Sequence, residues 1–543
     1  MVFARRSTTL LAAIIASCAM VLSLTACTSD NKTVVDGQTT VTSNSAGGVA
    51  VFTPSDGITL NQQTPLNKWA KLVPDLAKAL ADAGFKKGDI DHTTSDSLAK
   101  QSRAIQDFVV DHLSNNTTDD SGIAIAPDNM TLLVAPVVEA DASTRQYGDY
   151  ISQNLSTNDA TDEGATSDGE SSEDDSSKDD SSNTESDSTA SDEQAQAVDR
   201  LVSSLKLAKE SGMHVVLLGN SIEGYKPDAF VKFSDAQTIG KLQAEKMVSK
   251  LKLDKASKDN PKYIEVLLPY TAVDEKGNAN DSTFAQEAFR GIWQVLGSYY
   301  QKGVVESPSG TLDGKSTEND WQAVAYDAAK EGSTAKVLDK RLAKTDGQST
   351  LTRIDGIITM NDYIASEVVK ELDDLGYTGS AADINPQITI SGIVGNITGK
   401  KDLSRDAVPD PIKSPENDNA NDSSSSDDDA DEDTSASDKD RDSQWPLVTG
   451  YGAYVSNIPS IVNGKQWMTG MEDRQTIATD IAQACAKLNK DEALNSMPSI
   501  RNSEVGSVKK IPTISEPLLA VSASNLKSAL IDPGYISLAD AGL

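Results

Sequence analysis

Few residues of this chain have the types and spacing that catalysis needs. Its three histidines, His92, His112 and His214, lie far apart and do not fall at the spacing of metal ligands. The chain contains no H-E-x-x-H, C-x-x-C or G-x-S-x-G motif, which are the usual signatures of zinc hydrolases, dithiol oxidoreductases and serine esterases. Because no nucleophile is paired with a base, the sequence favours binding over catalysis. We expect no enzymatic activity, and the sequence indicates no cofactor or metal site.

Two short motifs resemble catalytic loops. Residues 310–316 (GTLDGKS) look like a phosphate-binding loop but are one residue short, and we expect no strand to lead into them. The pairs Ser97/Lys100 and Ser524/Lys527 match the S-x-x-K pattern of acyl-enzymes, which two common residues form by chance. We assign neither motif a function.

The net charge of −33 over 543 residues is distributed unevenly along the chain. Residues 159–193 hold fourteen acidic residues and one lysine, and residues 416–442 hold twelve acidic and two basic residues. Both stretches are rich in Ser and Asp and poor in apolar residues, which is typical of solvated, disordered linkers. They lack the glycine turn and bidentate glutamate of a calcium loop. An acidic chain is also a poor partner for nucleic acid, so we expect none.

The N-terminus predicts export. Arg5 and Arg6 precede a short apolar run from Leu10 to Leu24, which is typical of a secretory signal peptide. The following Leu-Thr-Ala-Cys27 resembles the lipobox of bacterial lipoproteins, and this resemblance implies cleavage before Cys27 and a lipid on its sulfur. An ordinary signal peptide with a chance cysteine is the alternative. We expect a protein anchored by lipid at the extracytoplasmic face of the cell membrane.

Between the acidic stretches, short apolar runs alternate with amphipathic helical patterns. The runs 214–218 (HVVLL), 263–268 (YIEVLL) and 354–360 (IDGIITM) read as buried strands, and helical spacing of apolar residues precedes the first and follows the other two. Continuous apolar strands joined through helices predict an α/β fold with doubly wound parallel sheets. About 400 residues exceed one sheet, so we expect two lobes, with ligands bound at the carboxyl ends of the strands.

Seven segments, in order, resemble the xylose and multiple-sugar solute-binding proteins of ABC importers, which have the ribose-type (type I) periplasmic-binding fold. They are VAVF (49–52) with Asn-Lys-Trp (67–69), LLVAP (132–136), LKLAKESGMHVVLL (205–218), FSDAQTIGKLQAEKMV (233–248), IDGIITMND (354–362), WPLVTGYGAYVSNIPSIVNGKQWMT (445–469) and the C-terminal tail 508–543. The resemblance implies two lobes that close around a monosaccharide and a membrane permease that receives it.

The resemblance also implies which residues contact the ligand. Matched one by one, they are Lys68, Trp69, Asn220, Asp235, Trp321, Asn361, Asp362 and Tyr451. Trp69 would stack on the sugar ring, with a core anchor as the alternative, and Asn361 would bind a hydroxyl, with a helix cap as the alternative. Trp321 matches the second aromatic position, and plain helix packing explains it equally well.

Several charged positions of the family pattern are replaced in this chain. The replacements are Gly219 and Asn220 for an aspartate and an arginine, Thr283 and Phe284 for paired asparagines, Gly452 for an acid, and Glu472 near an expected basic residue. The leading hypothesis is a lipid-anchored, monomeric solute-binding protein of an ABC importer with a remodelled pocket. The alternative is a surface lipoprotein that keeps the fold and acts as a sensor or interaction protein.

The expected organisation follows the chain in order. Residues 1–26 form the signal peptide, 27–47 a tether, 48–232 the N-lobe and 233–468 the C-lobe, with acidic insertions at 159–193 and 415–443. Residues 469–496 form a helix returning to the N-lobe, and 497–543 a tail that spans both lobes. The run 388–394 (ITISGIV) reads either as an added strand or as a competitor of the strand at 446–449.

Overall fold

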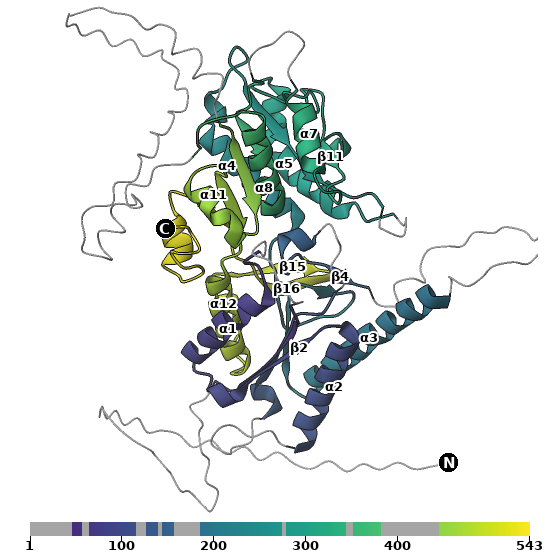
Figure 1. The fold of residues 1–543 in the computed structure, drawn as a ribbon. Coiled ribbons are helices and arrows are strands. Elements are labelled where there is room, and N and C mark those ends of the chain that lie inside the picture. Colours follow the sequence, from purple (N-terminus) through teal and green to yellow (C-terminus); the bar gives the residue numbers. More distant parts are fainter. Residues whose placement is uncertain are drawn as a thin grey trace, which may run out of the picture. The chain divides into compact units, whose positions relative to one another are not determined.

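The computed structural model describes residues 46–56, 65–115, 126–138, 144–156, 185–273, 279–343, 351–381 and 445–543. Their strands form two large sheets (Figure 1), which we call the N-lobe sheet and the C-lobe sheet. The N-lobe sheet has the order β15 (Ile500–Val505), β16 (Val508–Ile514), β7 (Ala229–Val231), β5 (His214–Leu218), β3 (Met130–Val134), β1 (Gly48–Pro54), β2 (Ile90–Ser95). The C-lobe sheet has the order β10 (Val305–Glu306), β8 (Lys262–Val266), β12 (Gly356–Ile358), β13 (Leu447–Tyr451), β14 (Met468–Met471), β17 (Leu519–Ser522).

Both sheets are parallel except at two strand pairs that involve the C-terminal tail. The pairs β15/β16 and β14/β17 are antiparallel, and every other pairing within the two sheets is parallel. Two additional two-stranded ladders join β4 (Asn154–Leu155) to β6 (Ser221–Ile222) and β9 (Leu268–Pro269) to β11 (Ala325–Tyr326). The α/β fold class with doubly wound parallel sheets in two lobes is therefore confirmed.

Helices cover both faces of the N-lobe sheet because its strands are apolar on both sides. Val49 and Val51 of β1 pack with α1 (Trp69–Asp82) and α12 (Arg474–Leu488), which lie side by side (Figure 1). Ala50 and Phe52 alternate with them and pack against α2 (Leu98–Asn115) and α3 (Glu185–Glu210). The period of two along a strand thus divides one apolar run between two cores.

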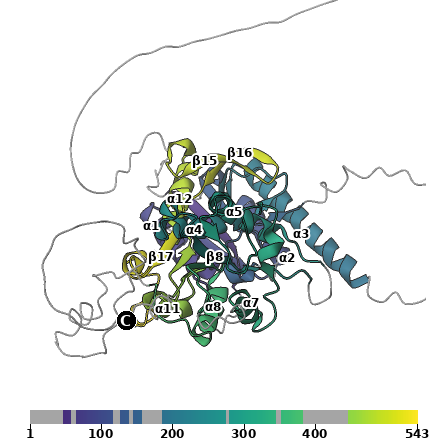
Figure 2. The same cartoon turned by 90° about the horizontal axis from the view of Figure 1, so that it is seen from above.

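The C-lobe sheet is covered in the same way. On one face, Ile264 and Val266 of β8 pack with α4 (Ala236–Lys250) and α5 (Thr283–Gln301), which are neighbours in Figure 2. On the other, Ile357 and Val448 pack with α7 (Ser333–Arg341) and α8 (Asp362–Asp374). The short helices α6 (Trp321–Val324) and α11 (Ile458–Val462) lie in the connections.

The chain passes between the two sheets three times. It leaves the N-lobe sheet after β7 and enters α4, returns after β14 through α12, and leaves again between β16 and β17. Since β15 and β16 belong to one sheet and β17 to the other, the tail contributes strands to both. The carboxyl ends of β7 and β14 therefore lie at the connections between the lobes.

One predicted boundary is wrong. We expected residues 159–193 to be linker throughout, but α3 begins at Glu185, so the end of that acidic stretch is helical. The chain from Ala190 to Ala197 is rich in Ala, Glu and Gln, which favour helices, so the helix extends back into the acidic stretch. The signal peptide, Cys27, the rest of that stretch, the insertion at 415–443 and the run 388–394 lie outside the described residues.

Among the residues that the structure describes, no helix combines the length and apolarity that a membrane span requires.

Close packing of α4 on α5 generates a testable prediction. A Cβ atom added at Gly291 of α5 would collide with the carbonyl oxygen of Gln237, and one at Gly240 of α4 with that of Ala288. Although alanine favours a helix by about 1 kcal/mol over glycine, Gly291→Ala should lower the free energy of unfolding by roughly 1–3 kcal/mol because of overpacking. Urea unfolding measures this.

The matched control is Ser249→Ala, at an exposed position of α4. It changes helix propensity without adding a contact, so its unfolding free energy should stay within about 0.5 kcal/mol of wild type. Equal stability of the Gly291→Ala and Ser249→Ala variants would contradict the close approach of the two helices.

Candidate functional site

A short segment that follows β3, residues 146–153, contacts five of the eight side chains that the sequence nominated. We call it the interlobe segment. It meets Lys68, Trp69 and Asn220 of the N-lobe and Asn361 and Tyr451 of the C-lobe. The structure thus brings together groups from both lobes that are up to 383 positions apart in the sequence, between Lys68 and Tyr451.

Lys68 holds the interlobe segment through an ion pair. Its Nζ lies 2.7 Å from Oδ1 of Asp149, and the backbone N–H of Trp69 donates to Oδ2 of the same carboxylate at 3.1 Å. The N–H of Asp149 in turn donates to the carbonyl of Asn67 at 2.8 Å. Because both partners of the ion pair are largely shielded from solvent, we expect it to be stronger than an exposed pair.

Trp69 belongs to an aromatic cluster with Tyr150 and Phe233. Its ring meets Tyr150 edge-on, with centroids 5.1 Å apart, and Phe233 at 5.7 Å, while Tyr150 and Phe233 stack at 4.7 Å. The Tyr150 hydroxyl donates to the carbonyl of Lys68. Trp69 is 3% exposed and is part of the N-lobe core, so it does anchor that core. Its stacking on a sugar stays a prediction.

On the C-lobe side, Tyr147 and Gln146 make the corresponding contacts. The ring of Tyr147 lies 4.6 Å from that of Phe284 and 6.2 Å from that of Tyr451. The Tyr454 hydroxyl donates to the carbonyl of Gln146 at 2.6 Å. Burial raises the pKa of Tyr147 above its usual range, so its hydroxyl stays neutral at physiological pH.

Asn361 has two separate functions at its two side-chain atoms. It is the N-cap of α8, where Oδ1 accepts a hydrogen bond from the N–H of Ile364 at 2.9 Å. Its Nδ2 donates to Oε1 of Gln146 at 3.1 Å. The cap is therefore observed, and the amide donor remains directed at the interlobe segment.

Asp362 lies beside Asn361 but has no free carboxylate oxygen. Its Oδ1 accepts from Gln466, and its Oδ2 accepts from the hydroxyl of Thr469 and the N–H of Tyr454. Burial raises its pKa to about 6, although these three donors oppose the shift. This arrangement ties α8 to β14, to Gln466 just before that strand and to the loop after β13, and it holds Asn361 in place.

Tyr451 lies in a buried polar group at the connections between the lobes. Its hydroxyl bonds to that of Ser234 at 2.5 Å, and Oε1 of Glu472 accepts from the N–H of Ser234 at 2.6 Å. Ser234 follows β7 and Glu472 follows β14, so the carboxyl group joins two of the three connections. Burial raises the pKa of Glu472 to about 7, with the hydrogen bonds from Ser234 and Tyr451 opposing the shift.

The remaining nominated residues have structural partners. Both ends of the Asn220 side chain are used, by the N–H of Gln153 and the carbonyl of Pro136. Asp235 caps α4 through the N–H of Thr238 and pairs with Lys232. Burial raises its pKa, but the hydrogen bonds from Lys232 and Thr238 outweigh burial and leave it below the usual value.

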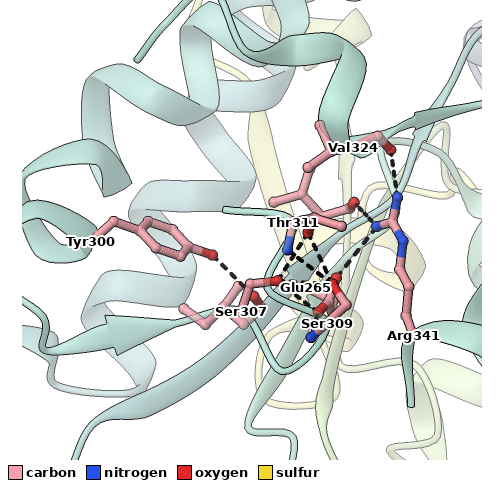
Figure 3. Close-up of polar contacts among 9 residues, drawn as sticks. Glu265, Tyr300, Ser307, Ser309, Thr311, Val324 and Arg341 are labelled. Atoms are coloured by element: carbon pink, nitrogen blue, oxygen red, sulfur yellow. Dashed lines mark hydrogen bonds and ion pairs between the residues drawn. The ribbon is translucent and has the colours of Figure 1, made fainter. Parts of the chain in front are cut away.

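Trp321 packs edge-on against Tyr270, 5.1 Å away, in the same apolar cluster as Tyr147. The short helix of Trp321 is held by Arg341, which forms a buried ion pair with Glu265 (Figure 3). The guanidinium group of Arg341 lies 3.4 Å from Oε2 of Glu265 and donates to the carbonyl of Val324 at 2.9 Å. Glu265 is fully buried on β8, so Arg341 connects that strand to the helix of Trp321.

The loop that resembled a phosphate-binding loop, residues 310–316, uses its own N–H donors: those of Lys315 and Ser316 donate to Oδ1 of Asp313 at 2.8 and 3.0 Å. The turn before it, residues 307–309, is arranged around a buried carboxylate. Glu265 Oε1 accepts hydrogen bonds from the hydroxyl of Ser307 and the N–H of Ser309, as Figure 3 shows. The strand β10 before this loop has two residues and ends at Glu306, so residues 307–309 separate it from the loop. Because the Asp313 carboxylate takes two of the loop's N–H donors, the loop disfavours a phosphate, since like charges repel.

The interlobe segment is the part of the site that sequence reasoning missed. Gln146, Tyr147, Asp149 and Tyr150 contact the nominated groups, yet they fit no helical or strand period. One signal was available: only 5% of the residues are aromatic, and Tyr147 and Tyr150 lie within four positions in the connection that follows β3. Aromatic residues in a polar stretch at the carboxyl end of a parallel strand indicate a binding region.

No family model matches the chain, and no curated protein sequence matches it. Solved structures do match. An ABC transporter solute-binding protein from Clostridium phytofermentans with bound β-D-glucose is 16% identical, with 91% of this chain and 99% of that chain covered and a TM-score of 0.43. A carbohydrate transporter solute-binding protein from Chloroflexus aurantiacus in complex with D-glucose is 18% identical, with 92% and 98% covered and a TM-score of 0.42.

A third match is a periplasmic ribose ABC transporter from Conexibacter woesei. It is 13% identical, with 90% of this chain and 96% of that chain covered and a TM-score of 0.41. In the described part of the present chain, no cluster of three His, Cys, Asp or Glu side chains could hold a metal ion.

The buried carboxyl group of Glu472 predicts a pH dependence. Its pKa in the folded protein, about 7, lies above the ordinary value of 4.5, so the folded state holds this proton more tightly than the unfolded state. The stability that it contributes is present below pH 4.5 and is lost as the pH rises through 7. A Glu472→Gln variant, which resembles the protonated form, should lose about 3 kcal/mol less stability between pH 4.5 and 8 than wild type.

Urea unfolding at both pH values measures this difference. Glu318→Gln, at an exposed position, is the control and should follow the wild-type pH dependence. A Glu472→Gln variant with an unchanged pH dependence would mean that Glu472 titrates normally.

Proposed function

We propose that this protein is the solute-binding component of an ABC importer and that it captures a monosaccharide between its two lobes. The observation that carries the proposal is the convergence of side chains from both lobes on one place. Lys68 and Trp69 approach it from the N-lobe, and Asn361 and Tyr451 approach it from the C-lobe. A ligand that contacts both lobes would stabilise the closed form of the protein. A permease could then recognise the loaded protein by its closed form.

The chemistry of this place suits a sugar. A pyranose has apolar C–H faces and a belt of hydroxyl groups, so it needs aromatic rings together with hydrogen-bond donors and acceptors. Trp69, Phe233, Phe284 and Tyr451 supply rings. The Lys68 ammonium group, the Asn361 amide and the Tyr454 hydroxyl supply donors. Because several charged groups of the related family are replaced here, the pocket would accept a different set of hydroxyls.

The proposal extends to location and partners. The predicted signal peptide and the lipobox resemblance at Cys27 support a lipoprotein anchored at the extracytoplasmic face of the membrane, and we propose that it is a monomer. A permease in that membrane would receive the solute. Within the site, we propose Lys68, Trp69, Asn361 and Tyr451 as ligand contacts and Asp362 as the group that positions Asn361. The contacts of Asn220, Asp235 and Trp321 with a ligand stay predictions.

A thermal-shift screen over pentoses, hexoses and inositols tests the function. A sugar present at 100 times its dissociation constant should stabilise the folded protein by about 2.7 kcal/mol, because it binds the native state only. The absence of a shift with every sugar would reject the transport function and would leave the sensor or interaction protein as the explanation of the fold.

The role of Asn361 has its own test. Asn361→Ser keeps a side-chain oxygen that caps α8 but removes the amide donor that reaches the interlobe segment. We expect the melting temperature to change little and the affinity for the sugar found in the screen to fall about tenfold, equivalent to one hydrogen bond of about 1.4 kcal/mol. Calorimetric titration measures the affinity.

The matched control for Asn361→Ser is Asp281→Ser. Asp281 precedes the exposed start of α5 and accepts hydrogen bonds from Thr283, so this variant tests loss of a local helix-start contact elsewhere. It should leave sugar affinity unchanged. Equal affinities in both variants would remove Asn361 from the site.

A further inference from the structure

The interlobe segment occupies the groups that the proposed function assigns to a solute. Asp149 pairs with the Lys68 ammonium group at 2.7 Å, and Gln146 accepts from the Asn361 amide at 3.1 Å. Two tyrosine rings take the aromatic positions: Tyr150 lies against Trp69 and Phe233, and Tyr147 lies against Phe284 and Tyr451. A sugar cannot use these same faces and donors while the segment is in place.

The backbone of the interlobe segment passes so close to Asn67 that there is no room for a side chain at Gly148. Gly148 has a φ of +98°, and a Cβ atom there would lie 2.5 Å from the carbonyl oxygen of Asn67 and 2.7 Å from its Cβ. A side chain at this position is therefore excluded both by backbone conformation and by space. The flanking N–H groups of Asp149 and Gln153 are fixed by the Asn67 carbonyl and the Asn220 side chain.

The chemistry of the segment matches the chemistry expected of a sugar. Its rings offer flat apolar faces to aromatic partners, and its carboxylate, amide oxygen and carbonyl accept from donors that would otherwise meet hydroxyl groups. Two lobes contribute to holding it: Tyr150 is buried in the N-lobe core cluster and Tyr147 in the C-lobe cluster. The segment therefore bridges the lobes as a bound solute would.

We propose that residues 146–153 are an intramolecular ligand of this site and that a monosaccharide binds by displacing them. The claim that a monosaccharide displaces the segment rests on the proposed function. Competition of this kind lowers the apparent affinity in proportion to the fraction of molecules whose site is open. If the segment is seated in 99% of molecules, the apparent dissociation constant is about 100 times the intrinsic one.

Gly148→Ala is the most direct test, because it displaces the segment without removing a side chain of the site. Gly224→Ala is the matched control: Gly224 also has a positive φ, +69°, but a Cβ atom there meets nothing within 4 Å. Hydrogen exchange at the N–H groups of Asp149 and Gln153 should become at least tenfold faster in Gly148→Ala than in Gly224→Ala. The two variants should unfold at similar temperatures, since a displaced ligand leaves the lobes folded.

The second measurement uses D-glucose and D-xylose as probes. We expect Gly148→Ala to bind at least one of them ten or more times more tightly than Gly224→Ala does. In the wild-type protein, a saturating amount of that sugar should speed exchange at Asp149 and Gln153, since it expels the segment. A sugar that slows exchange there would overturn the proposal, because the segment would then be a wall of the site.

The outcomes separate this inference from the proposed function. Faster exchange in Gly148→Ala with no binding of any sugar to either variant would support the intramolecular ligand and reject the sugar. Unchanged exchange, or a much lower unfolding temperature than Gly224→Ala, would overturn the intramolecular ligand, because the segment would then be part of the permanent core. Tyr147→Ala, which removes the ring that contacts Phe284 and Tyr451, is a second variant and should also speed exchange at Asp149 and Gln153.

Discussion

The hydrogen bond from the Ser234 N–H to the Glu472 carboxyl group is the contact on which the relation of the two lobes depends. It joins the chain leaving the N-lobe sheet after β7 to the chain leaving the C-lobe sheet after β14. The Tyr451 hydroxyl bonds to the same serine, and the Glu472 N–H donates to the side chain of Asn67, next to Lys68. This small buried polar cluster therefore fixes Tyr451 of the C-lobe relative to Asn67 and its neighbour Lys68 of the N-lobe.

A buried carboxyl group is costly unless it is protonated or fully hydrogen-bonded. Burial moves the pKa of Glu472 to about 7 and that of Asp362 to about 6, so both groups are near their transition at physiological pH. The partners of each are neutral N–H, amide and hydroxyl groups rather than an arginine or lysine. Hydrogen bonds are stronger in these low-polarity surroundings. Those around Glu472 therefore hold Tyr451, and those to Asp362 hold the start of α8, where Asn361 lies.

The sequence alone predicted the sheets well, because buried strands and amphipathic helices leave strong periodic signals. The runs containing β5, β8 and β12 were recognised from their apolar residues, and the two-lobe α/β class followed. The two-residue strand β10 was missed, since two residues carry no period. The start of α3 at Glu185 was missed because acidic and small residues are equally typical of a linker.

The site was less predictable than the fold because its decisive part is irregular. Lys68, Trp69, Asn361 and Tyr451 were nominated, and the structure brings them together. The segment that lies between them has regular structure only in the 3-10 turn Arg145–Tyr147, and it is positioned by contacts with residues about 70 to 300 positions away in the sequence. Such contacts are set by tertiary structure, and a linear pattern carries no record of them.

The alternatives left open by the sequence, core anchor or stacking ring for Trp69 and cap or ligand for Asn361, are compatible in the structure. Asn361 caps α8 with its oxygen and keeps its amide nitrogen for the interlobe segment. Trp69 packs into the N-lobe core while its ring also meets Tyr150 of that segment. In both cases the structural role fixes the side chain, and a fixed side chain loses less entropy when it binds. A residue that is held by the fold is for this reason a better ligand contact than a mobile one, so evidence of a structural role does not argue against a binding role.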